Sequence, residues 1–115
     1  MQPINAEALE ASLQQFAGKD VYVHLETTNG AYTEGAFGCF IRNGVIRFTR
    51  GGIRGTGPYR AGLELPNGFL YAEGLTDWEV DALGRLLIAG HDKEGRLTIA
   101  LELSHTPFAM RPEEA

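Results

Sequence analysis

The sequence predicts a mainly β domain of about eight short, mostly antiparallel strands, with one N-terminal helix that covers the sheets. A helical spacing of apolar residues is confined to the first 17 residues, and after Lys19 the apolar residues recur with a period of two. The 115 residues include 15 glycines, about twice the usual frequency, which is typical of a chain with many turns. The length and a hydrophobic content of 43% fit one domain, residues 1–115, with one core.

The helix is predicted at about residues 4–17. Its apolar residues recur at i, i+4 and i+7 and therefore share one face: Leu9, Leu13 and Phe16. Asn5 or Gln2 can cap the first turn, and Gly18 can end the last. Because a helix of about 12 to 15 residues is marginal in water by itself, we expect its apolar face to pack on the sheet.

The first strand is predicted from Lys19 onward, because apolar and polar residues alternate there. The apolar set is Val21, Val23 and Leu25, and the alternate set is Tyr22, His24 and Glu26. Asn29-Gly30 then supplies two residues that tolerate a positive φ, as a tight turn requires.

A β-hairpin is predicted next, over residues 36–50. Two strand-like runs, residues 36–42 and 45–50, flank Asn43-Gly44, which is the residue pair most typical of a two-residue type I′ turn. An exposed edge strand of this hairpin can pair with a second copy of the chain, so the sequence leaves a homodimer open.

Five further strands are predicted between turn residues that include glycine, proline, asparagine and aspartate. They are residues 59–65, 69–73, 78–81, 85–89 and 97–103. Their short connections favour antiparallel pairing, because parallel strands need long crossovers. The strands thus run from residue 19 to residue 103, and residues 109–115 are expected to form a flexible tail. The predicted core is Leu9, Leu13, Phe16, Val21, Val23, Leu25, Trp78, Leu86, Ile88, Ile99 and Leu101.

Charge is distributed unevenly along the chain. The formal net charge is −5, yet residues 35–63 contain five arginines and no acidic residue, so the rest of the chain carries −10. The five are Arg42, Arg47, Arg50, Arg54 and Arg60. A guanidinium binds carboxylates and phosphates through two parallel hydrogen bonds, so an all-arginine segment favours an anionic ligand or an acidic partner.

Residues 50–60 combine three of these arginines with four glycines. Backbone N–H groups of a glycine-rich loop can converge on an anion, and flanking arginines add charge. The predicted anion-binding residues are Arg50, Arg54, Gly55, Gly57, Tyr59 and Arg60. The segment lacks the Gly-Lys-Ser/Thr element of a Walker A loop. The alternative is a wide turn whose arginines pair with the protein's own acids.

Composition excludes several functional classes. A pI near 5.1 argues against a general nucleic-acid binder. Apolar runs are far shorter than the roughly 18 residues of a membrane span, and the first residues do not form a signal sequence, so we expect a cytoplasmic protein with no membrane partner. The single cysteine, Cys39, excludes an internal disulfide, and its apolar surroundings predict a small buried side chain.

The histidines offer the only recognisable acid–base candidates. His24 and His91 lie in or at the end of predicted strands and carry ordinary imidazole chemistry. Neither shows the i, i+4 spacing of a helical metal site. A site built from His24, Glu26 and His91 is the weaker interpretation, so we expect no metal and no cofactor.

Several blocks resemble the YojF family of small proteins from bacilli and related bacteria. They are DVYVHLETTNGAY at residues 20–32, IRN at 41–43, GTGPYRAGL at 55–63, LYAEGLT at 70–76 and AGH at 89–91. The resemblance runs from about residue 14 to residue 108 and implies a helix followed by coiled, bifurcated β-sheets. It also implies a partner, because the family's genes commonly lie beside one for a zinc deacetylase of bacillithiol biosynthesis, which acts on N-acetylglucosaminyl-malate. It carries over no catalytic residues.

Two functions compete on this reading. The first is a non-enzymatic accessory protein that binds a small carboxylate, a phosphate or an acidic partner, such as that deacetylase, through the arginine- and glycine-rich segment. The alternative is a small enzyme in which His24 or His91 acts as acid or base, while Arg54 or Arg60 orients an anionic substrate. Nucleic-acid binding through the same arginines is disfavoured by the charge of −10 elsewhere.

Overall fold

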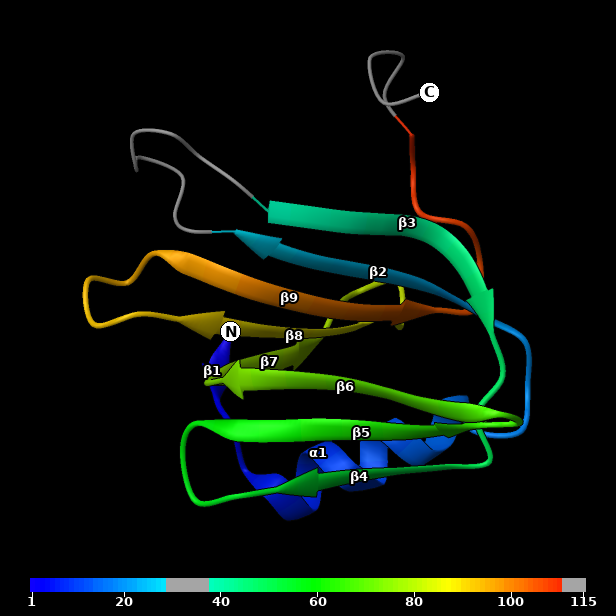
Figure 1. Cartoon of the computed structure of the whole chain (residues 1–115), viewed down its shortest axis with the longest axis horizontal. Coiled ribbons are helices and arrows are strands. Elements are labelled where there is room, and N and C mark those ends of the chain that lie inside the picture. The colour runs from blue at the N-terminus through cyan, green and yellow to red at the C-terminus, as the bar shows by residue number, and fades with distance from the viewer. Residues whose placement is uncertain (29–37, 111–115) are drawn as a thin grey trace.

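A computed structural model describes residues 1–28 and 38–110, which form two antiparallel sheets and one helix (Figure 1). The larger sheet has the order β1-β7-β8-β9-β2-β3, and the smaller has the order β4-β5-β6. The strands are β1 (Gln2–Pro3), β2 (Val21–Thr28), β3 (Gly38–Ile46), β4 (Arg50–Arg54), β5 (Tyr59–Leu65), β6 (Gly68–Leu75), β7 (Asp77–Val80), β8 (Leu86–His91) and β9 (Leu97–Ser104). The predicted β class is therefore correct. The turn predicted at Asn29-Gly30 lies outside the described residues, as do residues 111–115 of the predicted tail.

The helix begins and ends at the residues that its sequence provides for this. α1 (Ala6–Leu13) continues into a short 3-10 turn, η1 (Gln14–Phe16). The Asn5 side chain caps it by accepting a 3.0 Å hydrogen bond from the backbone N–H of Ala8. Gly18 follows with a φ of 76°, a value that favours glycine.

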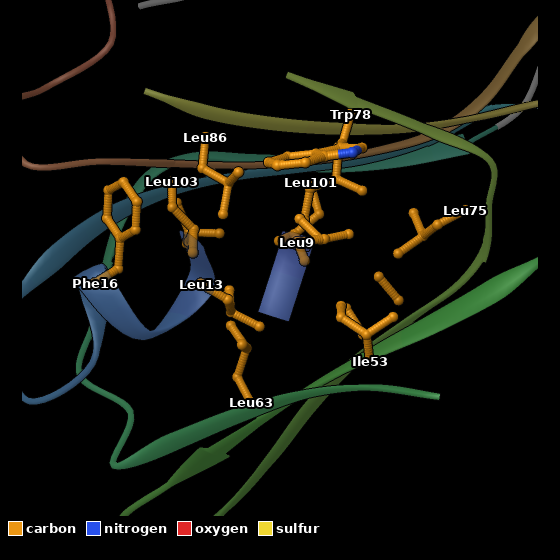
Figure 2. Packing of buried hydrophobic residues seen from close by; sticks show 14 of the residues in the cluster. Leu9, Leu13, Phe16, Ile53, Leu63, Leu75, Trp78, Leu86, Leu101 and Leu103 are labelled. Atoms are coloured by element: carbon orange, nitrogen blue, oxygen red, sulfur yellow. The ribbon is translucent and has the colours of Figure 1, made fainter. Parts of the chain in front are cut away.

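The core lies between the two sheets and against the helix. Of the predicted core residues, all are buried except Leu25 and Ile99, which are half-buried and pack against the same cluster. Figure 2 shows Leu9 and Leu13 of the helix between side chains of the two sheets. Those labelled on the larger sheet include Leu86, Leu101 and Leu103, and those on the smaller sheet are Ile53, Leu63 and Leu75. The helix thus joins the sheets through one shared core.

The hairpin predicted at Asn43-Gly44 is wrong. β3 continues through these residues without a turn and pairs with β2, with Val23 opposite Gly44 and His24 opposite Arg42. Asn43, at φ 60°, is therefore the extra residue of a β-bulge. A positive φ, which suits a tight turn, suits a bulge equally well, and long-range pairing decides between the two.

The loop predicted at the start of residues 50–60 is a strand, β4. Gly51 faces the core, where an added Cβ would lie 2.6 Å from Leu13 Cδ2. The glycine is thus needed for the close approach of helix and sheet. Side chains of α1 and η1 also satisfy the outer edge of β4: Gln14 Nε2 donates to Gly51 O at 2.7 Å, and Glu10 Oε1 accepts from Ile53 N–H at 3.2 Å.

Two hairpin turns share one Asp-x-x-Gly-Arg pattern, from Asp81 to Arg85 between β7 and β8 and from Asp92 to Arg96 between β8 and β9. In each turn, one aspartate oxygen accepts the backbone N–H of the arginine, and the other accepts its Nε–H. These bonds lower the pKa of Asp81 and of Asp92 below the ordinary value of 3.8, with the backbone N–H of the arginine as the largest cause.

We therefore expect these turns to lose their contribution to stability in acid. Because the folded-state pKa values are lowered, the contribution is fully present above the unfolded value of 3.8 and disappears as the pH falls through the lowered values. Urea unfolding at a series of pH values from about 5 to about 2 measures it. Asp92→Asn should remove part of the decline, and an identical decline in this variant would contradict the assignment.

Candidate functional site

A groove of about 410 Å³ lies on the outer face of the smaller sheet, beside the helix. It is lined by Glu10, Gln14, Arg50, Gly51, Gly52, Arg54, Arg60, Gly62, Glu64, Phe69 and Tyr71. The alternation of strands explains its composition, because Ile53, Ala61 and Leu63 point into the core and their even-numbered neighbours therefore face outward.

Two glycines on neighbouring strands lie beneath the groove. Gly52 on β4 lies opposite Gly62 on β5, which in turn lies opposite Tyr71 on β6. An added Cβ on Gly62 would lie 3.0 Å from Tyr71 Cε1. A Cβ on Gly52 would likewise lie 3.2 Å from Glu10 Oε1 and 3.3 Å from Arg54 Nη1, so neighbouring side chains take the space that the two glycines leave.

The three arginines of the groove differ in their partners. Arg50 forms a 3.0 Å ion pair with Glu64, and Arg54 lies 3.5 Å from Glu10. The side chains of Arg50 and Arg54 are 80% and 73% exposed, so these pairs contribute little to stability. Among the described residues, Arg60 has no carboxylate within ion-pair distance. Three arginines and two glutamates give the groove a net charge of +1.

An aromatic pair forms one side of the groove. The rings of Phe69 and Tyr71 stack with centroids 5.6 Å apart and an angle of 6° between their planes. The Arg60 guanidinium lies 4.6 Å from the centroid of the Tyr71 ring. Both aromatic residues are more than half exposed, so their rings give the groove an apolar wall.

The structure brings together only part of the predicted anion site. Arg50, Arg54 and Arg60 share the groove, whereas Gly55 and Gly57 lie in the turn between β4 and β5 with φ values of 105° and 127°. Tyr59 is half-buried and packs against the core instead. Outside residues 50–60, sequence reasoning did not find Glu10, Gln14, Gly62, Glu64, Phe69 and Tyr71. Strand alternation through residues 60–64 was the available signal for Gly62 and Glu64.

The other two arginines of the basic segment lie outside the groove. Arg47 Nε donates to Asp20 at 3.0 Å. Arg42 donates to the carbonyl of Ala109 and to His24. The acid-free segment thus serves separate parts of the surface rather than one patch.

The two candidate histidines also lie away from the groove. His24 is 8% exposed, with Nε2 at 3.0 Å from Glu26 Oε1. His91 Nδ1 lies 3.0 Å from Asp77 Oδ1, which also accepts a 2.6 Å bond from the Thr76 hydroxyl. The Thr76 bond is the largest cause, and the His91 bond the second, of the lowered pKa of Asp77. Within residues 1–28 and 38–110, no group of three metal-ligating side chains comes together.

The prediction that Cys39 is buried is wrong. It is exposed, because it lies on β3 at the edge of the larger sheet, and its Sγ is 3.6 Å from the Thr27 hydroxyl. The apolar residues around it in the sequence are exposed as well, with Phe40 at 62% and Ile41 at 50%.

No helix in the described part of the chain is long and apolar enough to cross a membrane.

Comparisons with known proteins agree with one another. Residues 3–108 match the family model described as "Protein of unknown function (DUF1806)". The chain is 42% identical over 116 residues to "Uncharacterized protein YojF" of Bacillus subtilis (strain 168), which covers 96% of this chain and 100% of that protein. It is also similar to the "Crystal Structure of Bacillus subtilis YojF protein", with a TM-score of 0.83 over 95% of this chain and 97% of that one. This chain, with its two sheets, its covering helix and its arginine-lined groove, therefore belongs to the YojF-like DUF1806 family.

Proposed function

We propose that the protein is a non-enzymatic binding protein that takes a small carboxylate, a phosphate or an acidic segment of a partner in its groove. The observation that carries this proposal is the pairing of Arg54 directly opposite Arg60 on neighbouring strands. Like charges in such positions destabilise a sheet. A bound anion would turn this repulsion into two favourable interactions.

The remainder of the groove fits such a ligand. Arg60, whose guanidinium rests on Tyr71, is held in position without a carboxylate partner among the described residues. Its N–H groups can therefore form the paired hydrogen bonds that carboxylates and phosphates accept. The net charge of +1 of the groove also favours an anion.

The family resemblance supports a more specific version of this proposal. In it, the ligand is either a carboxylate-bearing intermediate of bacillithiol biosynthesis or an acidic surface of the GlcNAc-malate deacetylase, in the cytoplasm. Co-purification of the tagged protein from a native host extract, with mass spectrometry of retained proteins and small molecules, distinguishes the two. If the folded protein retains neither the deacetylase nor such an intermediate after washing, the pathway assignment is contradicted.

The double variant Arg54→Gln/Arg60→Gln tests the groove. Without ligand we expect its melting temperature to equal or exceed that of the wild type, because the repulsion between the two arginines is gone. Phosphate or malate at about 100 times its dissociation constant should stabilise the wild type by about 2.7 kcal/mol but leave the variant unchanged. Differential scanning calorimetry with and without each anion measures both effects.

Arg47→Gln is the matched control, because Arg47 is an exposed arginine of the same segment whose partner Asp20 lies outside the groove. It should keep the wild-type response to the anion. Unfolding of the double variant would show that Arg54 and Arg60 are structural. An equal loss of response in the control would show that only general charge matters.

One observation favours an enzyme as the second candidate. His91 Nδ1 is held by Asp77, and no described residue bonds Nε2, which leaves this nitrogen available as a general base. The His91 side chain is 32% exposed, whereas that of His24 is 10% exposed. Screening esters and amides that carry a carboxylate tests this candidate. Turnover that His91→Gln abolishes and His105→Gln leaves intact would support it, and turnover unaffected by His91→Gln would exclude His91 as the base.

A further inference from the structure

The segment after β9, residues 107–110, lies against β3 and the outer face of the larger sheet (Figure 1). Its central residue, Phe108, is 3% exposed although the segment has no regular secondary structure. A buried aromatic side chain on an irregular terminal segment needs specific contacts to hold it. We call residues 107–110 the latch.

Two neighbouring residues of β3 hold the backbone of the latch. Asn43, the bulge residue, donates to Phe108 O at 2.8 Å and accepts from Phe108 N–H at 2.7 Å. Arg42 donates to Ala109 O from Nε at 3.0 Å and from Nη2 at 2.8 Å. The bulge that replaced the predicted hairpin thus presents the side chains that bind the terminal segment.

The Phe108 ring covers His24. The guanidinium groups of Arg42 and Arg85 lie 5.3 Å and 5.7 Å from the centroid of the ring. The ring meets the His24 imidazole edge-on, with centroids 6.3 Å apart. Together with Phe40, whose ring is 6.1 Å from His24, it explains why this histidine is buried on the outer face of the sheet.

His24 is in turn linked to the residue that holds the latch. Arg42 Nη1 lies 3.2 Å from His24 Nδ1, and a guanidinium can only donate, so Nδ1 accepts and carries no proton. The proton of the neutral ring is then on Nε2, which donates to Glu26 at 3.0 Å. The neutral imidazole therefore helps to orient the guanidinium that binds Ala109.

Among the described residues, charged groups from three strands face this imidazole. Glu26 is on the same strand, Arg42 lies opposite on β3, and Glu102 lies opposite on β9. Arg85, before β8, acts on Glu102 and contacts Phe108. The carboxylates of Glu26 and Glu102 can accommodate an imidazolium, and burial raises the pKa of Glu102. A protonated ring nevertheless loses its bond from Arg42, because Nδ1 then carries hydrogen and faces a second cation.

We propose that the latch closes over His24 while the imidazole is neutral and opens when His24 Nδ1 is protonated. Opening exposes the His24 side chain, which is 10% exposed in the closed state, so a solute reaches this histidine only in the open state. The device is independent of the groove, which shares none of these residues.

Hydrogen exchange of the Phe108 amide, which Asn43 binds, measures the closed state. After correction for intrinsic exchange, we expect wild-type protection to fall about tenfold as the pH is lowered from about 7.5 to about 5.5. His24→Asn retains an acceptor near the position of Nδ1 but cannot be protonated, so its protection should not change. His105→Asn, which alters the other histidine near the latch, should behave like the wild type. Constant wild-type protection, or an equal fall in His24→Asn, would overturn the proposal.

A second measurement does not require a substitution of His24. At about pH 7, Asn43→Ala should raise the rate at which diethyl pyrocarbonate modifies His24, relative to His105, by about tenfold, the effect expected when one hydrogen-bonding residue is lost. Asn67→Ala, an exposed asparagine in the turn between β5 and β6, should not change it. An unchanged rate in Asn43→Ala would show that the latch does not control access to His24.

Discussion

Gly90→Ala is expected to destabilise the protein by about 3 kcal/mol, near the upper end of the usual cost of overpacking. Gly90 is buried in β8, and a Cβ there would overlap the carbonyl oxygen of Gly74 and lie 2.6 Å from Ile99 Cγ2. The carbonyl belongs to the backbone of β6, so relief requires a shift in the backbone of β6 or of β8. Urea unfolding measures the change.

Gly68→Ala is the matched control, because this glycine also lies in a strand, has no positive φ and has open space around its Cα. Its unfolding midpoint should stay close to that of the wild type. A small effect of Gly90→Ala, similar to that of Gly68→Ala, would contradict the close contact of β6 with β8.

Leu13→Ala is expected to lower the free energy of unfolding by about 2–5 kcal/mol, as large-to-small changes in a core do. Leu13 is fully buried and lies in the shared core between the helix and both sheets (Figure 2). Its removal would leave a cavity beside Gly51, which has no side chain to fill it.

Gln15→Ala, on the exposed side of the short turn after α1, serves as the control and should shift the urea midpoint little. An unchanged midpoint for Leu13→Ala would mean that the helix is peripheral. The proposed groove would then lose one of its sides, because Glu10 and Gln14 belong to the same helical segment.

Periodicity predicted those parts of the fold whose pattern reflects burial directly. Leu9, Leu13 and Phe16 follow a helical period, and Val21 and Val23 follow a strand period, and the structure buries all five. Such patterns are reliable because each residue must present its apolar side chain to one core.

Local signals failed where a distant segment decides the conformation. Asn43-Gly44 is typical of a hairpin, but pairing with β2 and the bonds from Asn43 to Phe108 favour a bulge. The glycines at 51 and 52 similarly concealed β4, because their role depends on the helix and the groove that they meet in three dimensions.

For the candidate site as well, sequence reasoning predicted some residues and missed others. Charge alone indicated Arg50, Arg54 and Arg60, since an acid-free arginine segment is visible in the sequence. The aromatic pair of Phe69 and Tyr71 could not be assigned to these arginines, because the register of β5 against β6 contains an irregularity beside Tyr59. Only the paired strands show which side chains share the groove.

The most direct test of the groove is an NMR titration of the isotope-labelled protein with phosphate and, separately, with malate. We expect the Nε–H signals of Arg54 and Arg60 and the backbone amides of Gly52 and Gly62 to shift together along one saturating curve, while the Nε–H signal of Arg47 stays constant. Shifts confined to residues outside the groove, or no saturable shift with either anion, would contradict the proposal that the groove binds an anion.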